Sequence, residues 1–305
     1  MLTPRYIAVL GGGPSAEREV SLRSSAAVAK ALSSLGHHVV EVDPQPGKLR
    51  EQLPAGTDVV FLALHGTYGE DGTAQAELES LGVPYTGCGI LASRLAFDKA
   101  KTKAQCLKNH VPTARSQVLD NHHTEWPPGW LPPVVLKPVR QGSSVGLQFV
   151  DRPDELPKAL AEALRYDHEV LMEERIFGRE ITVGILDGQA LPIVEVRPRH
   201  GSYDYQNKYT SGATDYYCPA DFDSTTTLRI QQDALAAFRS IEGRDYGRVD
   251  IIVRPDGSPV ILEVNTLPGM TETSLLPKAA AAADIPFAQL CERMIAMAIQ
   301  RKGIP

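Results

Sequence analysis

The strongest constraint on the fold of this 305-residue chain is a pair of apolar runs at residues 247–266, GRVDIIVRPDGSPVILEVNT. The runs flank the letters PDGS, and Asp-Gly is the strongest two-residue hairpin signal. A two-residue turn at this point pairs Asp250 with Glu263 and Arg248 with Asn265. Side chains alternate between the two faces of a strand, so these four polar side chains are expected to share one face.

Two carboxylates at facing positions repel each other unless a cation lies between them. A solvated hairpin face is the usual explanation, and Arg248 is a structural partner for Asp250. The other residues of both runs are mostly Val, Ile and Leu, however, which indicates burial on both sides. Asp250, Glu263 and Asn265 carry the oxygen ligands that Mg²⁺ prefers, and protein-bound Mg²⁺ usually also contacts phosphates. The hairpin therefore predicts a magnesium site beside a phosphorylated compound.

Lysines near glycines are the candidates for holding that phosphate, because the chain has no G-x-x-x-x-G-K-[ST] loop. Lys137 ends an apolar run just before GSSVG at residues 142–146, whose glycines let backbone N–H groups approach phosphate oxygens. Lys99 and Lys208 are further candidates, although a single lysine is more often a solvated surface charge. Together with the acidic hairpin, the Lys137 segment predicts a nucleotide site.

Strand and helix patterns alternate over the N-terminal third, which predicts an α/β domain with an open parallel sheet. The expected strands there are 6–10, 38–42 and 59–64. A helix is expected over 95–114. The C-terminal half reads as antiparallel, α+β structure, and a polar segment at 198–215 is expected to form an ordered flap.

Composition excludes several classes of protein. Lys and Arg number 31 and Asp and Glu 37, and a net charge of −6 does not favour a nucleic-acid surface. No apolar run is long enough to span a bilayer, and no signal peptide is recognisable. The four cysteines form no C-x-x-C pair, which argues against a zinc ribbon or a disulfide framework. We therefore expect a cytoplasmic protein without nucleic-acid or membrane partners.

The opening segment LGGGPSAEREVSLRS, residues 10–24, offers an alternative nucleotide site. It fits the G-x-G-x-x-G/A pattern of dinucleotide-binding proteins, and the end of the second strand is acidic, with Glu41 and Asp43. A nicotinamide-dependent oxidoreductase is therefore an alternative. Against it, Pro14 removes a backbone donor, and Glu17 places a negative charge where a pyrophosphate would bind. An ammonium group suits Glu17 better.

The hairpin and the Lys137 segment resemble the ATP-grasp superfamily, and longer motifs resemble its D-alanine–D-alanine ligase family. The matching motifs run in order through nearly the whole chain: LGGGPSAEREVSLRS, ALHGTYGEDGTAQ, PYTGCG, DKAKTK, LKPVRQGSSVG, YDYQNKY, GRVDI and EVNTLPGMTETSLLPKAA. The resemblance implies an ATP-grasp fold preceded by an open parallel-sheet domain. It divides the chain into an N-terminal substrate domain, a central ATP-grasp subdomain and a C-terminal subdomain with the metal site and a closing loop, at residues 1–95, 96–178 and 179–305.

The function implied by the resemblance is ATP-dependent joining of two D-alanine molecules for peptidoglycan synthesis, through an acyl phosphate. It implies ATP and Mg²⁺, with two ions expected and Mn²⁺ as a substitute, and a homodimer. Another ATP-grasp carboxylate–amine ligase is the alternative within the superfamily.

The resemblance also implies residue roles around the first D-alanine. Glu17 holds its ammonium group, in a hydrogen-bonded set with Ser143 and Tyr209. Arg248 and the backbone N–H of Gly269 stabilise the developing oxyanion, as preorganised donors do. A tyrosine at position 209 points to an amine as the second nucleophile.

Other implied residues serve the second amino acid, the metal and the nucleotide. Ser274 and Leu275 receive the second carboxylate, and His65 lies near the reacting groups. The implied metal ligands are Asp250, Glu263 and Asn265. The implied ATP-binding residues are Lys99, Lys137 and Lys208 for the phosphates, and Glu173, Glu174, Ile176 and Glu180 for adenine and ribose. Relatives often carry lysine at position 174, and residues 203–209 match the loop that closes over the site.

Overall fold

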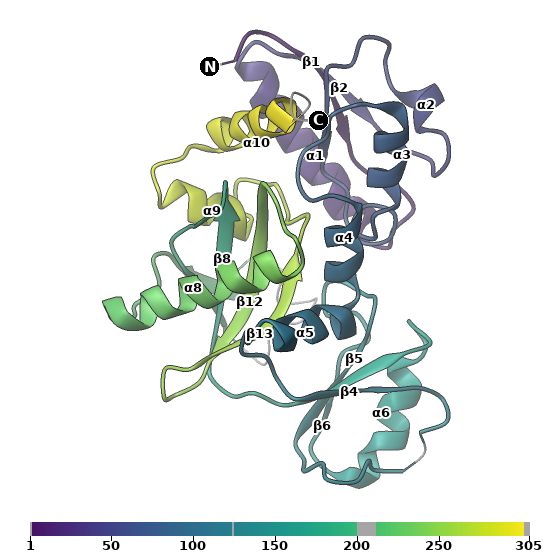
Figure 1. Cartoon of the computed structure of the whole chain (residues 1–305), viewed down its shortest axis with the longest axis vertical. Helices are drawn as coiled ribbons and strands as arrows, with labels where there is room; N and C mark the ends of the chain where they lie inside the picture. Colours follow the sequence, from purple (N-terminus) through teal and green to yellow (C-terminus); the bar gives the residue numbers. More distant parts are fainter. Residues whose placement is uncertain (1, 124, 200–211, 302–305) are drawn as a thin grey trace.

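We analysed a computed structural model that describes residues 2–123, 125–199 and 212–301 (Figure 1). Its N-terminal part contains a three-stranded parallel sheet, as expected. The strand order is β2-β1-β3, with bounds β1 (Tyr6–Leu10), β2 (His38–Val42) and β3 (Val59–Leu62). The helices of this part are α1 (Arg18–Ser34), α2 (Leu49–Gln52) and α3 (Thr73–Leu81). The helices α1 and α3 pack against opposite faces of the central strand β1, so its side chains after Tyr6 are buried on both sides.

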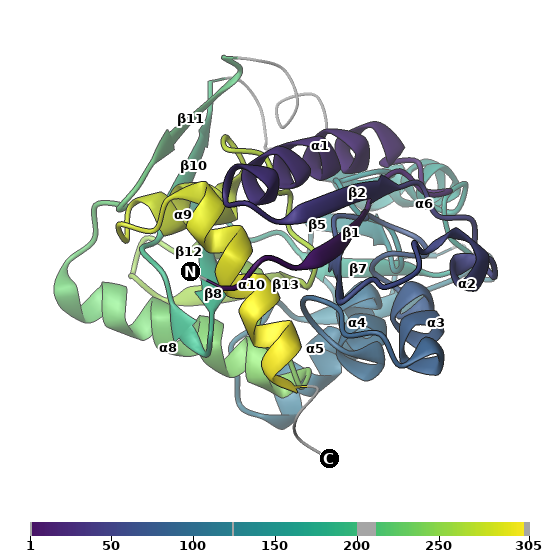
Figure 2. The ribbon, with the colours of Figure 1, turned by 90° about the horizontal axis from the view of Figure 1, so that it is seen from above.

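The last helix, α10 (Phe287–Arg301), packs against this N-terminal sheet although it lies at the other end of the chain (Figures 1 and 2). Leu290, Met294 and Ile295 share one hydrophobic core with Ile7 and Val28. The expected domains 1–95, 96–178 and 179–305 stay a prediction. The last helix of the third domain shares a hydrophobic core with the sheet of the first.

The central part is a four-stranded antiparallel sheet with one helix against it. The strand order is β4-β7-β5-β6, with bounds β4 (Ser116–Leu119), β5 (Val134–Pro138), β6 (Gln148–Val150) and β7 (Val170–Glu174). A short 3₁₀ turn leads into α6 (Leu156–Ala163), whose apolar face is buried. The sequence pattern missed β4, because a four-residue edge strand with two polar residues carries little periodic signal.

The C-terminal part is built on a six-stranded antiparallel sheet. The strand order is β11-β10-β8-β12-β13, with β9 beside β8, and the bounds are β8 (Arg179–Leu186), β9 (Gln189–Ala190), β10 (Val194–Pro198), β11 (Thr214–Tyr217), β12 (Tyr246–Val253) and β13 (Pro259–Asn265). One face packs against α4 (Ile90–Phe97), α5 (Lys99–Lys108) and α8 (Ser224–Ser240), and the other against α9 (Leu275–Ala281). Among the described residues, no helix is long and apolar enough to cross a membrane.

The β12–β13 hairpin confirms the pairing of Asp250 with Glu263 and of Arg248 with Asn265, but its turn differs from the expected one. Arg254 N donates to Ser258 O, so three residues form the loop where two were expected. Gly257 has a φ of 82°, typical of the left-handed residue that ends such loops. A β-bulge next to Asp250 then shifts the register by one residue, which restores the predicted pairs at the polar end.

The helix expected over 95–114 is wrong in its bounds: α4 and α5 are separated at Asp98, α4 already begins at Ile90, and residues 109–114 are not helical. Asp98 adopts an extended backbone, and its carboxylate accepts a hydrogen bond from Lys101 N, 3.0 Å away. An aspartate at this position caps a new helix, because it satisfies a backbone donor that the helix itself leaves unpaired. The break places Lys99 in the first turn of α5.

Candidate active site

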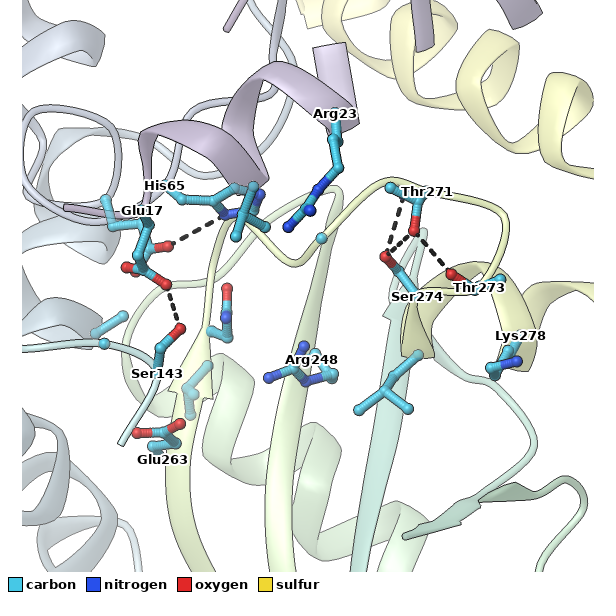
Figure 3. A pocket seen from close by; sticks show the side chains of 18 of the residues that line it. Glu17, Arg23, His65, Ser143, Arg248, Glu263, Thr271, Thr273, Ser274 and Lys278 are labelled. Carbon is cyan, nitrogen blue, oxygen red and sulfur yellow. Dashed lines mark hydrogen bonds and ion pairs between the residues drawn. The ribbon is translucent and has the colours of Figure 1, made fainter. Parts of the chain in front are cut away.

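Two adjoining cavities lie where the three parts of the chain meet. The larger, of about 590 Å³, is lined by the start of α1, the loop after β5, the polar ends of β12 and β13, and residues 269–278 (Figure 3). The smaller, of about 290 Å³, lies between the central sheet and the C-terminal sheet. Both are lined by Lys99, Gln141, Glu263 and Leu275, so a ligand in one cavity can reach a ligand in the other.

One wall of the larger cavity joins the N-terminal part to the central part. Ser143 Oγ donates a hydrogen bond to Glu17 Oε1 (Figure 3). A Cβ on Gly142 would lie only 2.7 Å from Glu17 Oε2, so a larger residue here would displace the Glu17 carboxylate from this position. Ser143 and Ser144 both have positive φ, at 52° and 59°, a strained conformation that often occurs at functional sites.

Arg248 lies between the Glu17–Ser143 pair and Ser274 (Figure 3). Its guanidinium donates two hydrogen bonds of 2.8 Å to the carboxylate of Asp250, and Thr182 Oγ donates a third of 2.6 Å. The structural alternative considered for Arg248 is therefore present. The same contact also fixes the guanidinium at the cavity wall, which is what a preorganised donor requires.

The opposite wall is a hydroxyl-rich segment before α9. Thr271 N donates to Ser274 Oγ at 3.1 Å, and the Thr271 and Ser274 hydroxyls lie 2.8 Å apart (Figure 3). Gly269 and Leu275 line the cavity beside them. His65 is buried, with Nε2 3.3 Å from Ser24 Oγ and Nδ1 3.6 Å from Glu70.

The smaller cavity is lined by two of the candidate phosphate lysines, Lys99 and Lys137, and by a buried acid, Glu173. Glu173 forms ion pairs with Lys137 at 2.6 Å and with Lys103 at 2.7 Å. Burial lowers the pKa of Lys103 to about 8, so the amine is still mainly protonated at pH 7. Lys99 donates a short hydrogen bond to Gln141 O, and its Nζ lies 3.8 Å from Glu263.

Glu174, Ile176 and Glu180 also line the smaller cavity. The carboxylate of Glu174 forms an ion pair of 3.2 Å with Arg254, so the acid that replaces the lysine of many relatives has a partner of its own. Arg175, within the stretch 173–176 expected to line adenine, stacks on the rings of Phe149 and Phe177 at 4.3 and 5.1 Å. This stack forms an aromatic wall suited to a flat base.

Two sequence profiles match the chain: the D-ala D-ala ligase N-terminus over residues 40–88 and the D-ala D-ala ligase C-terminus over residues 113–296. The D-alanine--D-alanine ligase of Methylacidiphilum infernorum is 48% identical over 98% of this chain and 97% of its own length. The chain belongs to the D-alanine–D-alanine ligase family.

Solved structures agree with this assignment. The D-alanine--D-alanine ligase of Bacillus anthracis complexed with ATP superposes with a TM-score of 0.85 and 33% identity, covering 98% of both chains. A D-Ala:D-Ser ligase from Enterococcus faecalis gives 0.83 and 27%, covering 97% of this chain and all of its own. The ATP-grasp fold and the family resemblance are therefore confirmed.

This family member offers oxygen ligands that fit Mg²⁺. Within the described residues, no three His, Cys, Asp or Glu side chains form a metal-binding cluster. Asp250 and Glu263 face each other across β12 and β13, and both line the smaller cavity, while Asn265 lines the larger one. Two carboxylates and an amide suit Mg²⁺, which takes its remaining ligands from phosphates and water.

The opening glycines of this ligase-family chain are not arranged as a dinucleotide site. Asp43, the candidate ribose ligand of that alternative, accepts hydrogen bonds from Arg18 at 2.8 Å and from Gly13 N at 2.9 Å. The hydrogen bond from Arg18 lowers the pKa of Asp43, so the carboxylate is ionised and already paired. The segment instead presents Glu17 to the larger cavity.

Two of the expected residues, Lys208 and Tyr209, and the closing segment 203–209 lie outside the described residues. Every other expected site residue lines one of the two cavities. Sequence patterns did not point to several polar residues that line the larger cavity: Arg23, Glu70, Thr271, Thr273 and Lys278. Lys278 was recognisable in principle, because it follows Ser274 by four residues at helical spacing.

Proposed function

We propose that this chain joins two D-alanine molecules into D-alanyl-D-alanine at the expense of ATP, for peptidoglycan synthesis. The observation that carries the proposal is the pair of adjoining cavities, one lined by Glu17, Ser143, Arg248 and Ser274, the other by Lys137 and Glu173. Phosphorylation of a carboxylate requires a pocket for the amino acid that adjoins a pocket for the nucleotide. Family membership across both profiles supports the same reaction.

In this proposal, the amino acids occupy the larger cavity. The carboxylate of Glu17 binds the ammonium group of the first D-alanine, and Ser143 holds that carboxylate in place. The second D-alanine binds with its carboxylate at Ser274 and Leu275. Lys278 adds a positive charge to the same wall. Tyr209 joins Glu17 and Ser143 in one hydrogen-bonded group. His65 lies near the reacting groups.

The smaller cavity receives ATP. Lys99, Lys137 and Lys208 bind its phosphates, whereas Glu173, Glu174, Ile176 and Glu180 surround adenine and ribose. The terminal phosphoryl group passes to the first carboxylate, giving an acyl phosphate and ADP. The amine of the second D-alanine attacks the acyl carbon, Arg248 and Gly269 N–H stabilise the oxyanion, and inorganic phosphate leaves.

Asp250, Glu263 and Asn265 would hold Mg²⁺, with a second ion expected and Mn²⁺ as a substitute. The metal would neutralise phosphate charge during phosphoryl transfer. We further propose that the enzyme acts in the cytoplasm as a homodimer, with residues 203–209 closing over the site to exclude water. Sedimentation at twice the mass of one chain tests the dimer.

Release of inorganic phosphate from Mg-ATP tests the function directly. D-alanine is expected to stimulate release strongly, and L-alanine serves as the matched control. The product is identified as the dipeptide by mass spectrometry. Release that does not depend on D-alanine would contradict the proposal. Stimulation by a different amino acid instead would indicate another carboxylate–amine ligase of the superfamily.

A further inference from the structure

A buried carboxylate of the smaller cavity contacts two lysines at once. Glu173 is 3% exposed and lies near the end of β7. Its Oε1 lies 2.7 Å from Lys103 Nζ, and its Oε2 lies 2.6 Å from Lys137 Nζ. Each oxygen of the carboxylate therefore has an ammonium group of its own.

The two lysines differ in their surroundings. Lys137 comes from β5 and lines the cavity, so its ammonium group can reach a ligand. Lys103 comes from α5, is 2% exposed and lines neither cavity. Its Nζ donates to Thr113 Oγ at 2.7 Å and to Ala114 O at 3.1 Å. Glu173 Oε1 adds an ion pair of 2.7 Å that lacks hydrogen-bond geometry, so two hydrogen bonds and one charge contact hold the Lys103 ammonium group in place.

Phosphates entering the cavity would compete with Glu173 for Lys137. A buried carboxylate that loses its counter-charge is strongly disfavoured. If Lys137 were the sole partner of Glu173, its movement towards a phosphate would leave such a carboxylate behind. Because Lys103 stays in contact with Oε1, one positive charge remains with Glu173 whatever Lys137 binds.

We propose that Lys103 is a positioning residue for phosphate binding: it neutralises Glu173, so that the charge of Lys137 is available to the phosphates of the nucleotide. The proposal rests on the proposed use of ATP. Lys103 acts through Lys137 and does not itself touch the ligand.

Equilibrium binding of Mg-ADP and of adenosine to the full chain tests this role. The variants are Lys103→Met, Glu173→Gln and the double substitution, with Lys108→Met as control, because Lys108 is exposed on the same helix. Lys103→Met is expected to weaken Mg-ADP binding by about tenfold and adenosine binding much less, because only phosphates need Lys137. The double variant is expected to recover most of the loss, since it has no buried carboxylate to neutralise.

A merely structural role for Lys103 gives a different pattern. It would weaken ADP and adenosine equally, or make the double variant bind ADP no better than Lys103→Met, and either result overturns the proposal. If Lys103→Met does not fold, Lys103→Gln keeps a donor for Thr113 and is judged by the same ratio of ADP to adenosine affinity. Wild-type protein that binds no Mg-ADP would instead refute the proposed use of ATP, whatever the variants do.

Discussion

At the scale of single residues, the chemistry of the site depends on which oxygens are already engaged. Asp250 is held by Arg248 and Thr182. Among the described residues, the cation paired with Glu263 is Lys99, whose Nζ lies 3.8 Å from the carboxylate. Glu263 also lines both cavities. It is therefore the carboxylate best placed to bind a metal between the nucleotide and the amino acid.

Glu263→Gln is expected to lower kcat by more than about 100-fold, because an amide is a weaker Mg²⁺ ligand than a carboxylate. Steady-state phosphate release at several Mg²⁺ concentrations measures the effect. Asp256→Asn makes the same chemical change at the exposed turn of the same hairpin and is expected to leave kcat unchanged. Near-normal turnover by Glu263→Gln would remove this residue from the metal site.

At the scale of elements, sequence patterns predicted the strands of the β12–β13 hairpin but not the form of its turn. Two apolar runs predicted its strands, and the assumed two-residue turn predicted the cross-strand partners Asp250 and Glu263. The Asp-Gly signal did not distinguish a two-residue turn from a three-residue turn, and no pattern marks a bulge. The two errors cancel at the site, because the bulge reverses the one-residue shift made at the turn.

Gly257→Ala tests whether the turn and the site are independent. Gly257 has a φ of 82°, and a Cβ there would meet nothing closer than 3.8 Å, so the substitution adds backbone strain without a clash. We expect a loss of about 1–2 kcal/mol in the free energy of unfolding, measured with urea, and unchanged kcat. Gly257→Asn should lose less, since asparagine tolerates this conformation. Impaired catalysis in a folded variant would show that the turn sets the register at the site.

An ion cluster around the buried Glu195 joins β8 and β10 and should make the sheet sensitive to acid. Burial disfavours ionisation of Glu195, but hydrogen bonds of 2.7–2.9 Å from Arg179 and Arg197 outweigh it and lower its pKa to about 2. An unfolded glutamate has a pKa near 4.5. The contribution of Glu195 is therefore complete above pH 4.5 and is lost as the pH falls towards 2.

Glu195→Gln is expected to be less stable than the wild type at pH 7, with the pH-dependent part at most about 3 kcal/mol. That difference should shrink between pH 4.5 and 2. Urea unfolding across this range measures it, and Glu51→Gln at an exposed position serves as control. A difference that stays constant with pH would show that Arg179 and Arg197 do not lower the pKa of Glu195 below that of an unfolded glutamate.

At the scale of the whole molecule, long motifs predicted more than local periodicity did. Motifs spread through the chain predicted the family, and the residues they contain come together around two cavities. Packing could not be predicted in this way. The contact of α10 with the N-terminal sheet and the position of Lys278 beside Ser274 depend on how distant segments meet. A capping aspartate, Asp98, was visible in the sequence, but the surrounding helical pattern obscured it.

The nucleotide cavity lies between the central and C-terminal sheets, so nucleotide binding should stabilise the whole molecule. A ligand that binds only the folded state at 100 times its Kd adds about 2.7 kcal/mol. Mg-ATP without D-alanine is therefore expected to raise Tm by several degrees in a thermal-shift assay, with Mg²⁺ alone as control. NADH should leave Tm unchanged. The ribose of a dinucleotide would need the carboxylate of Asp43, which already accepts hydrogen bonds from Arg18 and Gly13 N. A rise with NADH and none with Mg-ATP would favour the nicotinamide-dependent alternative and reassign the cavity.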